Sequence, residues 1–205
     1  MHPETLTPNA GALVPGLSRF SDFYLAGGTA LALQIGHRIS VDFDFFSAEP
    51  IEKGLLPKLK RAFPNEKVIP AVNNPDELTA MANGVKITFL HYPFPPRQRL
   101  TEYEKIKLLG VKEIAAAKAY TVGRRGEYKD YIDLYFILRG NHSTLKEIIE
   151  LANEKYGAEF NDRLFLEQLA YDEDIIEAPI QFLKTPVARS EIARLLEEEI
   201  RGIAL

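Results

Sequence analysis

The sequence has no cysteine among its 205 residues. Disulfide bonds, thiolate nucleophiles and thiolate metal sites are therefore excluded, and any metal must bind to oxygen or imidazole. The absence also agrees with a reducing compartment. A chain of this length can bury a sizeable core without disulfides, so we expect one compact body.

Long hydrophobic runs are also lacking. No apolar run approaches the roughly 20 residues that a membrane-spanning helix needs. Residues 1–11 have neither the basic nor the apolar region of a signal peptide. Hydrophobic residues make up 46% of the chain and charged residues 26%, as in an ordinary folded domain. We therefore expect a cytoplasmic protein with no membrane partner.

A general excess of positive charge is the third feature that is missing. The net charge of −4 argues against a broadly basic surface for nucleic acids. The charges are unevenly distributed, because residues 97–129 contain nine Lys/Arg and four Asp/Glu, whereas residues 147–205 contain six and fourteen. A local basic patch for phosphate groups therefore remains compatible with the sequence.

The first half of the chain alternates between strand and helix patterns. Residues 23–26 are apolar and aromatic and lead into Gly27 and Gly28, after which good helix formers continue to Gly36. This order predicts a strand, a tight turn and a helix. Residues 41–46 then alternate apolar and acidic side chains, as a strand does.

Further elements follow from spacing and turn residues. Leucines at helical spacing predict a helix over 51–63, and the Asn-Gly pair at 83–84 predicts a hairpin of strands 77–82 and 85–92. We expect prolines 93, 95 and 96 to end the sheet and the chain beyond Leu100 to be all-helical, with helices over 111–122, 127–138, 143–156, 163–170 and 188–201.

These elements predict the α+β fold class. We expect a small mixed or antiparallel sheet with flanking helices, followed by a C-terminal helical region. The predicted domains are a core over residues 1–100 and a helical region over residues 101–205 that packs on the core.

Gly27 and Gly28 form a candidate phosphate site. They have no side chain to block an anion, and the N–H groups and positive dipole end of the following helix point toward this position, with the Thr29 hydroxyl beside it. The alternative is a packing turn with no ligand.

Asp42 and Asp44 form a candidate metal site. One residue separates them on a strand, so both carboxylates emerge on one face about 7 Å apart and can hold a hard cation such as Mg²⁺ or Mn²⁺. Phe43 and Phe45 should point the other way, into the core. The alternative is a solvated strand face with no metal.

The combination of these two motifs is more specific than either alone. Gly27 and Gly28, followed after thirteen residues by Asp42 to Phe45, resemble the signature of the nucleotidyltransferase superfamily, whose fold is like that of DNA polymerase beta. The fuller string over residues 25–46 resembles the AbiEii/AbiGii toxin family of nucleotidyltransferases.

A second cluster extends this resemblance. The family has Lys-x-x-Ala-x-x-x-Arg followed by Asp-x-x-Asp-Leu, and this chain has a lysine, threonine and arginine before two aspartates and a leucine: Lys118, Thr121, Arg125, Asp130, Asp133 and Leu134. Thr121 stands where the family has alanine, and Ala116 stands where it tends to have an acid. The resemblance implies that Lys118 and Arg125 bind the triphosphate and that Asp130 lies near the reaction centre as base for the acceptor.

The residues themselves allow other roles for this cluster. Lys118 interrupts the apolar stripe of its predicted helix, so it either extends to solvent or faces a buried anion such as a phosphate or Asp130. Asp130 could serve the helix dipole, and Asp133 could pair with Arg124 or Arg125.

Two further positions concern the catalytic acids. Arg38 is placed in sequence to reach a phosphate or Asp42, or else to cap the preceding helix. Many relatives carry a third carboxylate on a neighbouring strand. The corresponding strand here, residues 85–90, has Lys86 and Thr88 instead. Either Asp130 takes the place of that acid, or the chemistry proceeds with two acids, or the enzyme is impaired.

The resemblance implies an enzyme that depends on Mg²⁺ or Mn²⁺ and transfers a nucleoside monophosphate from a nucleoside triphosphate. The acceptor would be RNA, with the tRNA 3′ end as one candidate, or protein. The chain would be the toxin of a toxin–antitoxin or phage-defence pair with a cognate antitoxin. The competing hypothesis is a catalytically impaired module of the same fold that binds a nucleotide or a partner.

Overall fold

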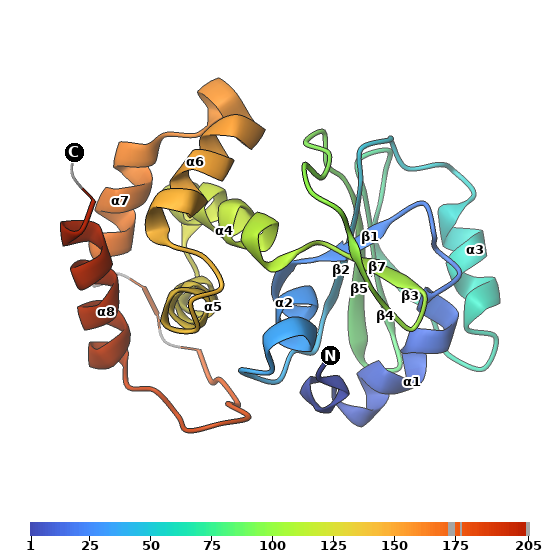
Figure 1. Ribbon diagram of the computed structural model, residues 1–205. Coiled ribbons are helices and arrows are strands. Elements are labelled where there is room, and N and C mark those ends of the chain that lie inside the picture. Colours follow the sequence, from blue (N-terminus) through green and yellow to red (C-terminus); the bar gives the residue numbers. More distant parts are fainter. Residues whose placement is uncertain (172–174, 177, 204–205) are drawn as a thin grey trace. The chain divides into compact units, whose positions relative to one another are not determined.

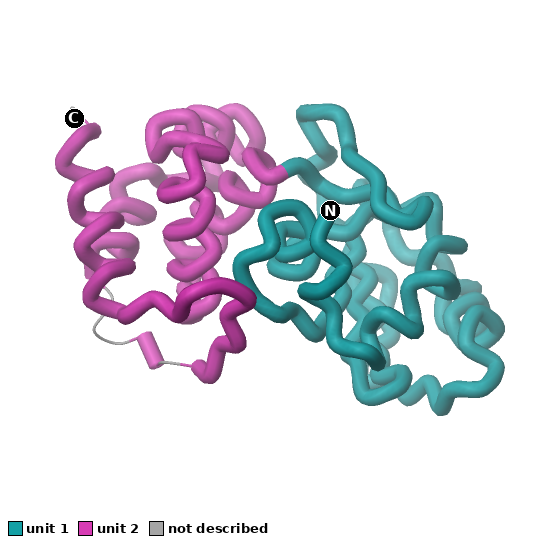
Figure 2. Tube along the Cα trace, turned by 60° about the horizontal axis from the view of Figure 1, so that its bottom comes forward, with its two compact units in different colours: residues 1–110 teal, residues 111–205 magenta. Residues whose placement is uncertain are grey.

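A computed structural model describes residues 1–171, 175–176 and 178–203 (Figure 1). The chain divides into two compact units, residues 1–110 and residues 111–205 (Figure 2). Within the described residues, no helix combines the length and the apolar character that crossing a membrane would require.

The first unit is built on a mixed seven-stranded sheet with the order β3-β4-β5-β2-β1-β7-β6. The pairs β1–β2, β3–β4, β4–β5 and β6–β7 are antiparallel, whereas β2–β5 and β1–β7 are parallel. The strands are β1 (Tyr24–Ala26), β2 (Phe43–Ser47), β3 (Ile69–Asn73), β4 (Glu77–Ala82), β5 (Val85–His91), β6 (Thr101–Tyr103) and β7 (Ile106–Leu108).

Short helices accompany this sheet: the 3₁₀ helix η1 (Pro3–Thr5), α1 (Pro8–Leu17), α2 (Gly27–Ile35) and α3 (Leu55–Ala62). Helix α2 ends at Gly36, whose φ of 64° is the left-handed conformation that glycine adopts readily. Pro57 lies in the first turn of α3, where its missing N–H breaks no helical hydrogen bond.

The core of the first unit is aromatic. The rings of Phe45 and Phe89 stack with centroids 5.1 Å apart, and Phe20 and Phe23 also pack on Phe89. These side chains come from β2, β5 and the segment before β1, so their burial holds the central strands to the N-terminal region.

The predicted hairpin is confirmed. Ala82 pairs with Val85, and the two residues between them, Asn83 and Gly84, have φ values of 50° and 75°. Both values match the tight turn that an Asn-Gly pair favours between antiparallel strands.

The expectation that prolines end the sheet is wrong. After the proline-rich connection the chain returns as the hairpin β6–β7, and Leu108 pairs with Leu25 of β1. The turn residues Glu104 and Lys105 have φ values of 48° and 66° without being glycine. The sequence therefore carried no usual turn signal here, and the first compact unit extends to residue 110.

The second unit is helical, as expected. Its helices are α4 (Val111–Arg125), α5 (Tyr128–Arg139), α6 (Leu145–Tyr156), η2 (Gly157–Glu159), α7 (Asp162–Ala170) and α8 (Arg189–Arg201). Helix α4 packs on α5, α6 and α7, while α8 packs on α5 and α7. Together with the mixed sheet and its helices, this unit confirms the predicted fold class.

Candidate functional site

The glycine turn after β1 has the geometry that the sequence predicted. Helix α2 begins at Gly27, which has a φ of +63°, and it follows Ala26, whose methyl group cannot cap the helix. The first N–H groups of a helix have no partner within the helix. The start of α2 therefore offers donors that suit an anion.

Asp44 lies directly against this turn. In the antiparallel register of β1 and β2, Asp44 is opposite Ala26. A Cβ atom on Gly27 would lie 3.0 Å from Asp44 Oδ2. Within the first unit, the structure therefore brings the glycine turn and the second acid of the Asp-x-Asp pair together.

The alternation along β2 is confirmed. Phe43 and Phe45 are buried in the core, whereas Asp44 and Phe46 are half-buried on the other face. Asp42, just before the strand, is also half-buried. Both acids thus retain access from outside the core, as a metal site requires.

Thr29 and Arg38 are both buried, and Thr29 contacts the backbone of Asp42. The Thr29 hydroxyl lies 2.7 Å from Ser40 Oγ and also donates to the carbonyl oxygen of Asp42. Arg38 donates from Nη1 to the carbonyl oxygen of Ile39 over 3.2 Å. Thr29 therefore ties the first turn of α2 to the backbone of the first acid.

The neighbouring strand β5 carries Lys86 and Thr88 beside the two acids. Thr88 is opposite Asp44 in the parallel register, and Lys86 Nζ lies 3.2 Å from Asp42 Oδ2. The sequence showed Lys86 as a departure from the family pattern, but it did not show this ion pair. The alternation of side chains along β5 could have predicted it, because Lys86 lies between two buried residues and therefore faces away from the core.

The residues of this site fit a magnesium ion bound together with a triphosphate. Among the described residues, no group of three or more His, Asp or Glu side chains could hold a metal by itself. Mg²⁺ in nucleotide enzymes is usually held by one or two carboxylates, with phosphates and waters completing its shell. Asp42 and Asp44 match that donor set.

In the second unit, Lys118, Asp130 and Asp133 form a buried cluster. Lys118 Nζ lies 2.7 Å from Asp130 Oδ1 and 2.7 Å from Asp133 Oδ2. The three side chains are 8%, 8% and 0% exposed. Lys118 therefore faces two buried carboxylates rather than solvent. It forms ion pairs with both Asp130 and Asp133.

The charge state of Lys118 follows from these contacts. Burial by itself lowers the pKa of its ammonium, but the charges of Asp133 and Asp130 outweigh burial and hold the pKa above its ordinary value. Lys118 is therefore protonated at neutral pH, and the two carboxylates share its charge.

Asp130 also belongs to the start of α5. Its Oδ2 accepts a hydrogen bond from the backbone N–H of Glu127 over 3.1 Å, as part of a capping box. Arg125 at the end of α4 is exposed, and its Nη1 lies 3.3 Å from Glu127 Oε1. Of the predicted second cluster, Arg125 alone presents its charge to solvent.

The basic segment 97–129 belongs to both units. The boundary between the units lies at residues 110 and 111. Lys107 in the first unit donates to the carbonyl oxygen of Ser21 over 2.7 Å. Lys118 in the second unit is buried, so its charge is not part of a surface patch.

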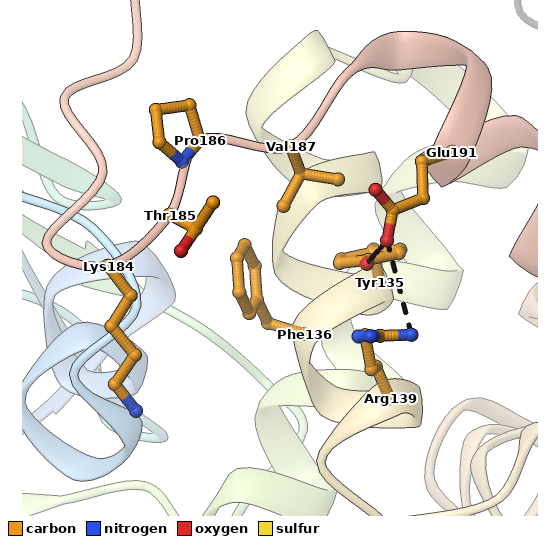
Figure 3. Close-up of a pocket in the computed structure, with 8 residues that line it drawn as sticks. All are labelled: Tyr135, Phe136, Arg139, Lys184, Thr185, Pro186, Val187 and Glu191. Carbon is orange, nitrogen blue, oxygen red and sulfur yellow. Dashed lines mark hydrogen bonds and ion pairs between the residues drawn. The ribbon is translucent and has the colours of Figure 1, made fainter.

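A cavity of about 420 Å³ lies elsewhere in the second unit, between α5 and the segment before α8 (Figure 3). Tyr135 donates to Glu191 Oε1 over 2.6 Å at its wall, and Arg139 lies 4.0 Å from the same carboxylate. None of the residues predicted to form the site lines this cavity.

A match to a sequence-family model shows the family to which the chain belongs. The sequence model described as "Nucleotidyl transferase AbiEii toxin, Type IV TA system" matches residues 17–204. The chain belongs to this family. An uncharacterised protein of Aquifex aeolicus (strain VF5) is similar to this AbiEii-family chain, with 34% identity over 169 residues, which are 80% of each chain.

Two solved structures share the fold of the AbiEii-family chain. MenT4, a nucleotidyltransferase toxin from Mycobacterium tuberculosis H37Rv, has a TM-score of 0.63 at 16% identity, covering 96% of this chain and 85% of its own. JHP933 from Helicobacter pylori has a TM-score of 0.51 at 17% identity, covering 93% and 90%. These likenesses support the nucleotidyltransferase fold.

Proposed function

We propose that this AbiEii-family chain transfers a nucleoside monophosphate from a nucleoside triphosphate to an acceptor hydroxyl, in a reaction that depends on Mg²⁺ or Mn²⁺. One observation carries the proposal: the carboxylate of Asp44 lies against the Gly27 turn that begins α2. A phosphate donor site and a metal ligand thus adjoin each other in one unit.

Each residue of the first unit has a distinct task in this proposal. Gly27 and Gly28 leave room for the triphosphate, and the N–H groups of the first helical turn donate to its oxygens. Asp42 and Asp44 hold the metal, which when bound neutralises phosphate charge in the transition state. Thr29 positions the backbone of Asp42 through its buried hydroxyl.

The transfer balances as a single displacement at the α-phosphorus. A bond forms between the acceptor oxygen and the α-phosphorus, while the bond from that phosphorus to the bridging oxygen breaks. Pyrophosphate leaves with the electron pair. The proton of the acceptor hydroxyl passes to a carboxylate, and the family resemblance assigns this task to Asp130.

The second cluster supports two roles that experiments can separate. The family resemblance assigns Lys118 and Arg125 to the triphosphate. The geometry supports a structural role as well, because the Lys118 ammonium directs hydrogen bonds to Asp130 and Asp133 and so joins α4 to α5. Arg125 is exposed and well suited to bind a phosphate.

The biological role that we propose is that of a toxin with a cognate antitoxin. The description of the family as part of type IV toxin–antitoxin systems supports this role. The acceptor would be an RNA, with the 3′ end of tRNA as the first candidate, or a protein. An RNA 3′ end supplies the hydroxyl nucleophile that the displacement needs.

A second candidate function rests on Lys86. Its ammonium pairs with Asp42, and strand β5 offers no carboxylate between Val85 and Leu90, so the site is also compatible with a module that binds a nucleotide without transferring it.

Labelled transfer separates the two candidates. The protein is incubated with Mg²⁺, total RNA and each of the four α-labelled nucleoside triphosphates in turn. We expect one or more of them to label a product, and we expect Asp44→Asn to reduce the rate by about a hundredfold or more. Nuclease and protease digestion then identifies the class of acceptor. No transfer from any of the four, together with tight nucleotide binding, would favour the binding module.

A further inference from the structure

Lys86 contacts one of the two candidate metal ligands. Its Nζ lies 3.2 Å from Asp42 Oδ2, with the two side chains 43% and 34% exposed. A lysine ammonium and a divalent cation would compete for the same carboxylate oxygen of Asp42. In this structure the Asp42 carboxylate is therefore paired with a lysine side chain of the protein itself.

The strand register explains why Lys86 reaches this site. Strands β2 and β5 are parallel, with Phe43 opposite Ile87 and Asp44 opposite Thr88. Phe43 and Ile87 are buried. The residues that alternate with them face the opposite side of the sheet, so Lys86 projects on the same face as both acids.

The physical character of this pair allows exchange. Both side chains are partly exposed to water, and such ion pairs contribute little to stability because solvent screens them. An ammonium this close nevertheless repels a divalent cation and occupies an oxygen that the cation needs. Lys86 should therefore weaken metal binding without preventing it.

We propose that Lys86 is a counter-ion within the site that competes with the metal for Asp42. A third carboxylate on β5 would add negative charge beside the two acids and favour metal binding. Lys86 instead adds a positive charge beside Asp42, which lowers the net negative charge of the site. This inference rests on the proposed function, because it assumes that Asp42 and Asp44 bind the metal.

Direct metal titration tests the proposal without any assay of transfer. The Mn²⁺ complex of a nucleoside triphosphate analogue with a non-cleavable α–β bridge is added to the full chain, and the unbound complex is followed by electron paramagnetic resonance. We expect one Mn²⁺ per wild-type chain and about three- to tenfold tighter binding by Lys86→Met, since each tenfold step needs only a modest change in charge interaction. Lys86→Glu, which adds a third acid beside Asp42, should bind more tightly still.

Two control variants keep this comparison specific. Lys86→Arg retains the positive charge and should bind Mn²⁺ like the wild type. Lys58→Met removes a similarly exposed lysine of the same unit, whose Nζ lies 3.7 Å from Asp22 rather than from the candidate ligands. If Lys58→Met tightened binding as much as Lys86→Met, the effect would reflect net charge alone and the proposal would fail.

Asp44→Asn distinguishes the inference from the function on which it rests. If Asp44→Asn loses Mn²⁺ binding while Lys86→Met binds like the wild type, the metal site stands and the role of Lys86 is overturned. If Asp44→Asn binds Mn²⁺ like the wild type, the metal site itself is wrong. Absence of binding by both the wild type and Lys86→Met would overturn both.

Discussion

Each unit of the protein contains one lysine beside a pair of aspartates, but the two groups differ in their access to water. In the first unit, Lys86 and Asp42 are 43% and 34% exposed, with a contact of 3.2 Å. In the second unit, Lys118 makes two contacts of 2.7 Å and its aspartates are almost completely buried. The same residue types thus form one open group and one closed group.

The difference originates in secondary structure. The open acids are two residues apart at the start of a strand, on the face opposite the aromatic core. The closed acids are three residues apart on α5, a helix that is buried on most sides. Water can replace a lost partner in the open group, whereas a buried charge that loses its partner stays unpaired. The open group therefore suits ligand exchange and the closed group suits stability.

The largest effect that we expect comes from Lys118→Met. The change leaves two buried carboxylates without their shared cation, which should lower the free energy of unfolding by about 3–5 kcal/mol. Urea unfolding at neutral pH measures this loss. Nucleotide binding, measured in the same variant below its unfolding midpoint, then shows whether Lys118 also contacts the triphosphate.

Lys86→Met is the matched control for this change. It removes the lysine of the open group and should alter the free energy of unfolding by no more than about 1 kcal/mol. If the two lysine variants lost equal stability, the contrast between an open and a closed group would be wrong.

The second prediction compares the aspartates of the two groups. Asp133→Asn removes a buried charge that meets Lys118 at 2.7 Å and should lower the free energy of unfolding by about 1–3 kcal/mol. Asp44→Asn changes a half-buried side chain and should lower the stability of the metal-free protein less than Asp133→Asn does. Thermal melts in the presence of a chelator measure both. A loss of stability in Asp44→Asn as large as that in Asp133→Asn would make Asp44 a structural residue.

The open group was predictable because its signals are local. Strand alternation places Asp42 and Asp44 on one face, and a glycine pair before a helix indicates a turn with room for an anion. Gly27 has the positive φ that such a turn requires. These properties depend on a few consecutive residues, so the sequence alone carries them.

The closed group, helix α1, strand β3 and the hairpin β6–β7 depend on tertiary contacts. Nothing local indicates that Lys118 reaches Asp133 across two helices. Helix α1 contains Pro15 and is stabilised by the burial of Leu13 and Leu17, whereas its composition disfavours a helix. Strand β3 contains Pro70 at the edge of the sheet, where one missing N–H is tolerated.

The hairpin β6–β7 was missed for a related reason. Glu104 and Lys105 adopt the left-handed conformation at a turn where Asn or Gly is usual. Pairing of Leu108 with Leu25 at the sheet stabilises this turn from a distance. The pairing of β7 with β1 therefore compensates for two turn residues that do not favour the left-handed conformation.

The smallest effect that we expect is at the exposed ion pair of Glu147 and Lys112. Its contribution to stability should depend on pH. Glu147 Oε1 lies 2.9 Å from Lys112 Nζ, and the glutamate also caps the start of α6. The hydrogen bond from Lys112, followed by those from Thr144 and Ser143, lowers the pKa of Glu147 from 4.5 to about 2. The ionised form is therefore favoured by folding. Its contribution is complete above a pH of about 4.5 and is lost as the pH falls toward about 2.

Glu147→Gln isolates this contribution. The variant should be less stable than the wild type near neutral pH, and the difference should shrink as the pH falls through the range from about 4.5 to about 2. Urea unfolding of both proteins at several pH values measures the difference, from which the titration of all other carboxylates cancels. Glu150→Gln, which alters a looser pair of 3.9 Å with Lys146 on the same helix, is the control. A difference for Glu147→Gln that stayed constant with pH would mean that the amide replaces the carboxylate fully as a cap. The stabilising effect of Glu147 would then come from hydrogen bonding rather than from charge.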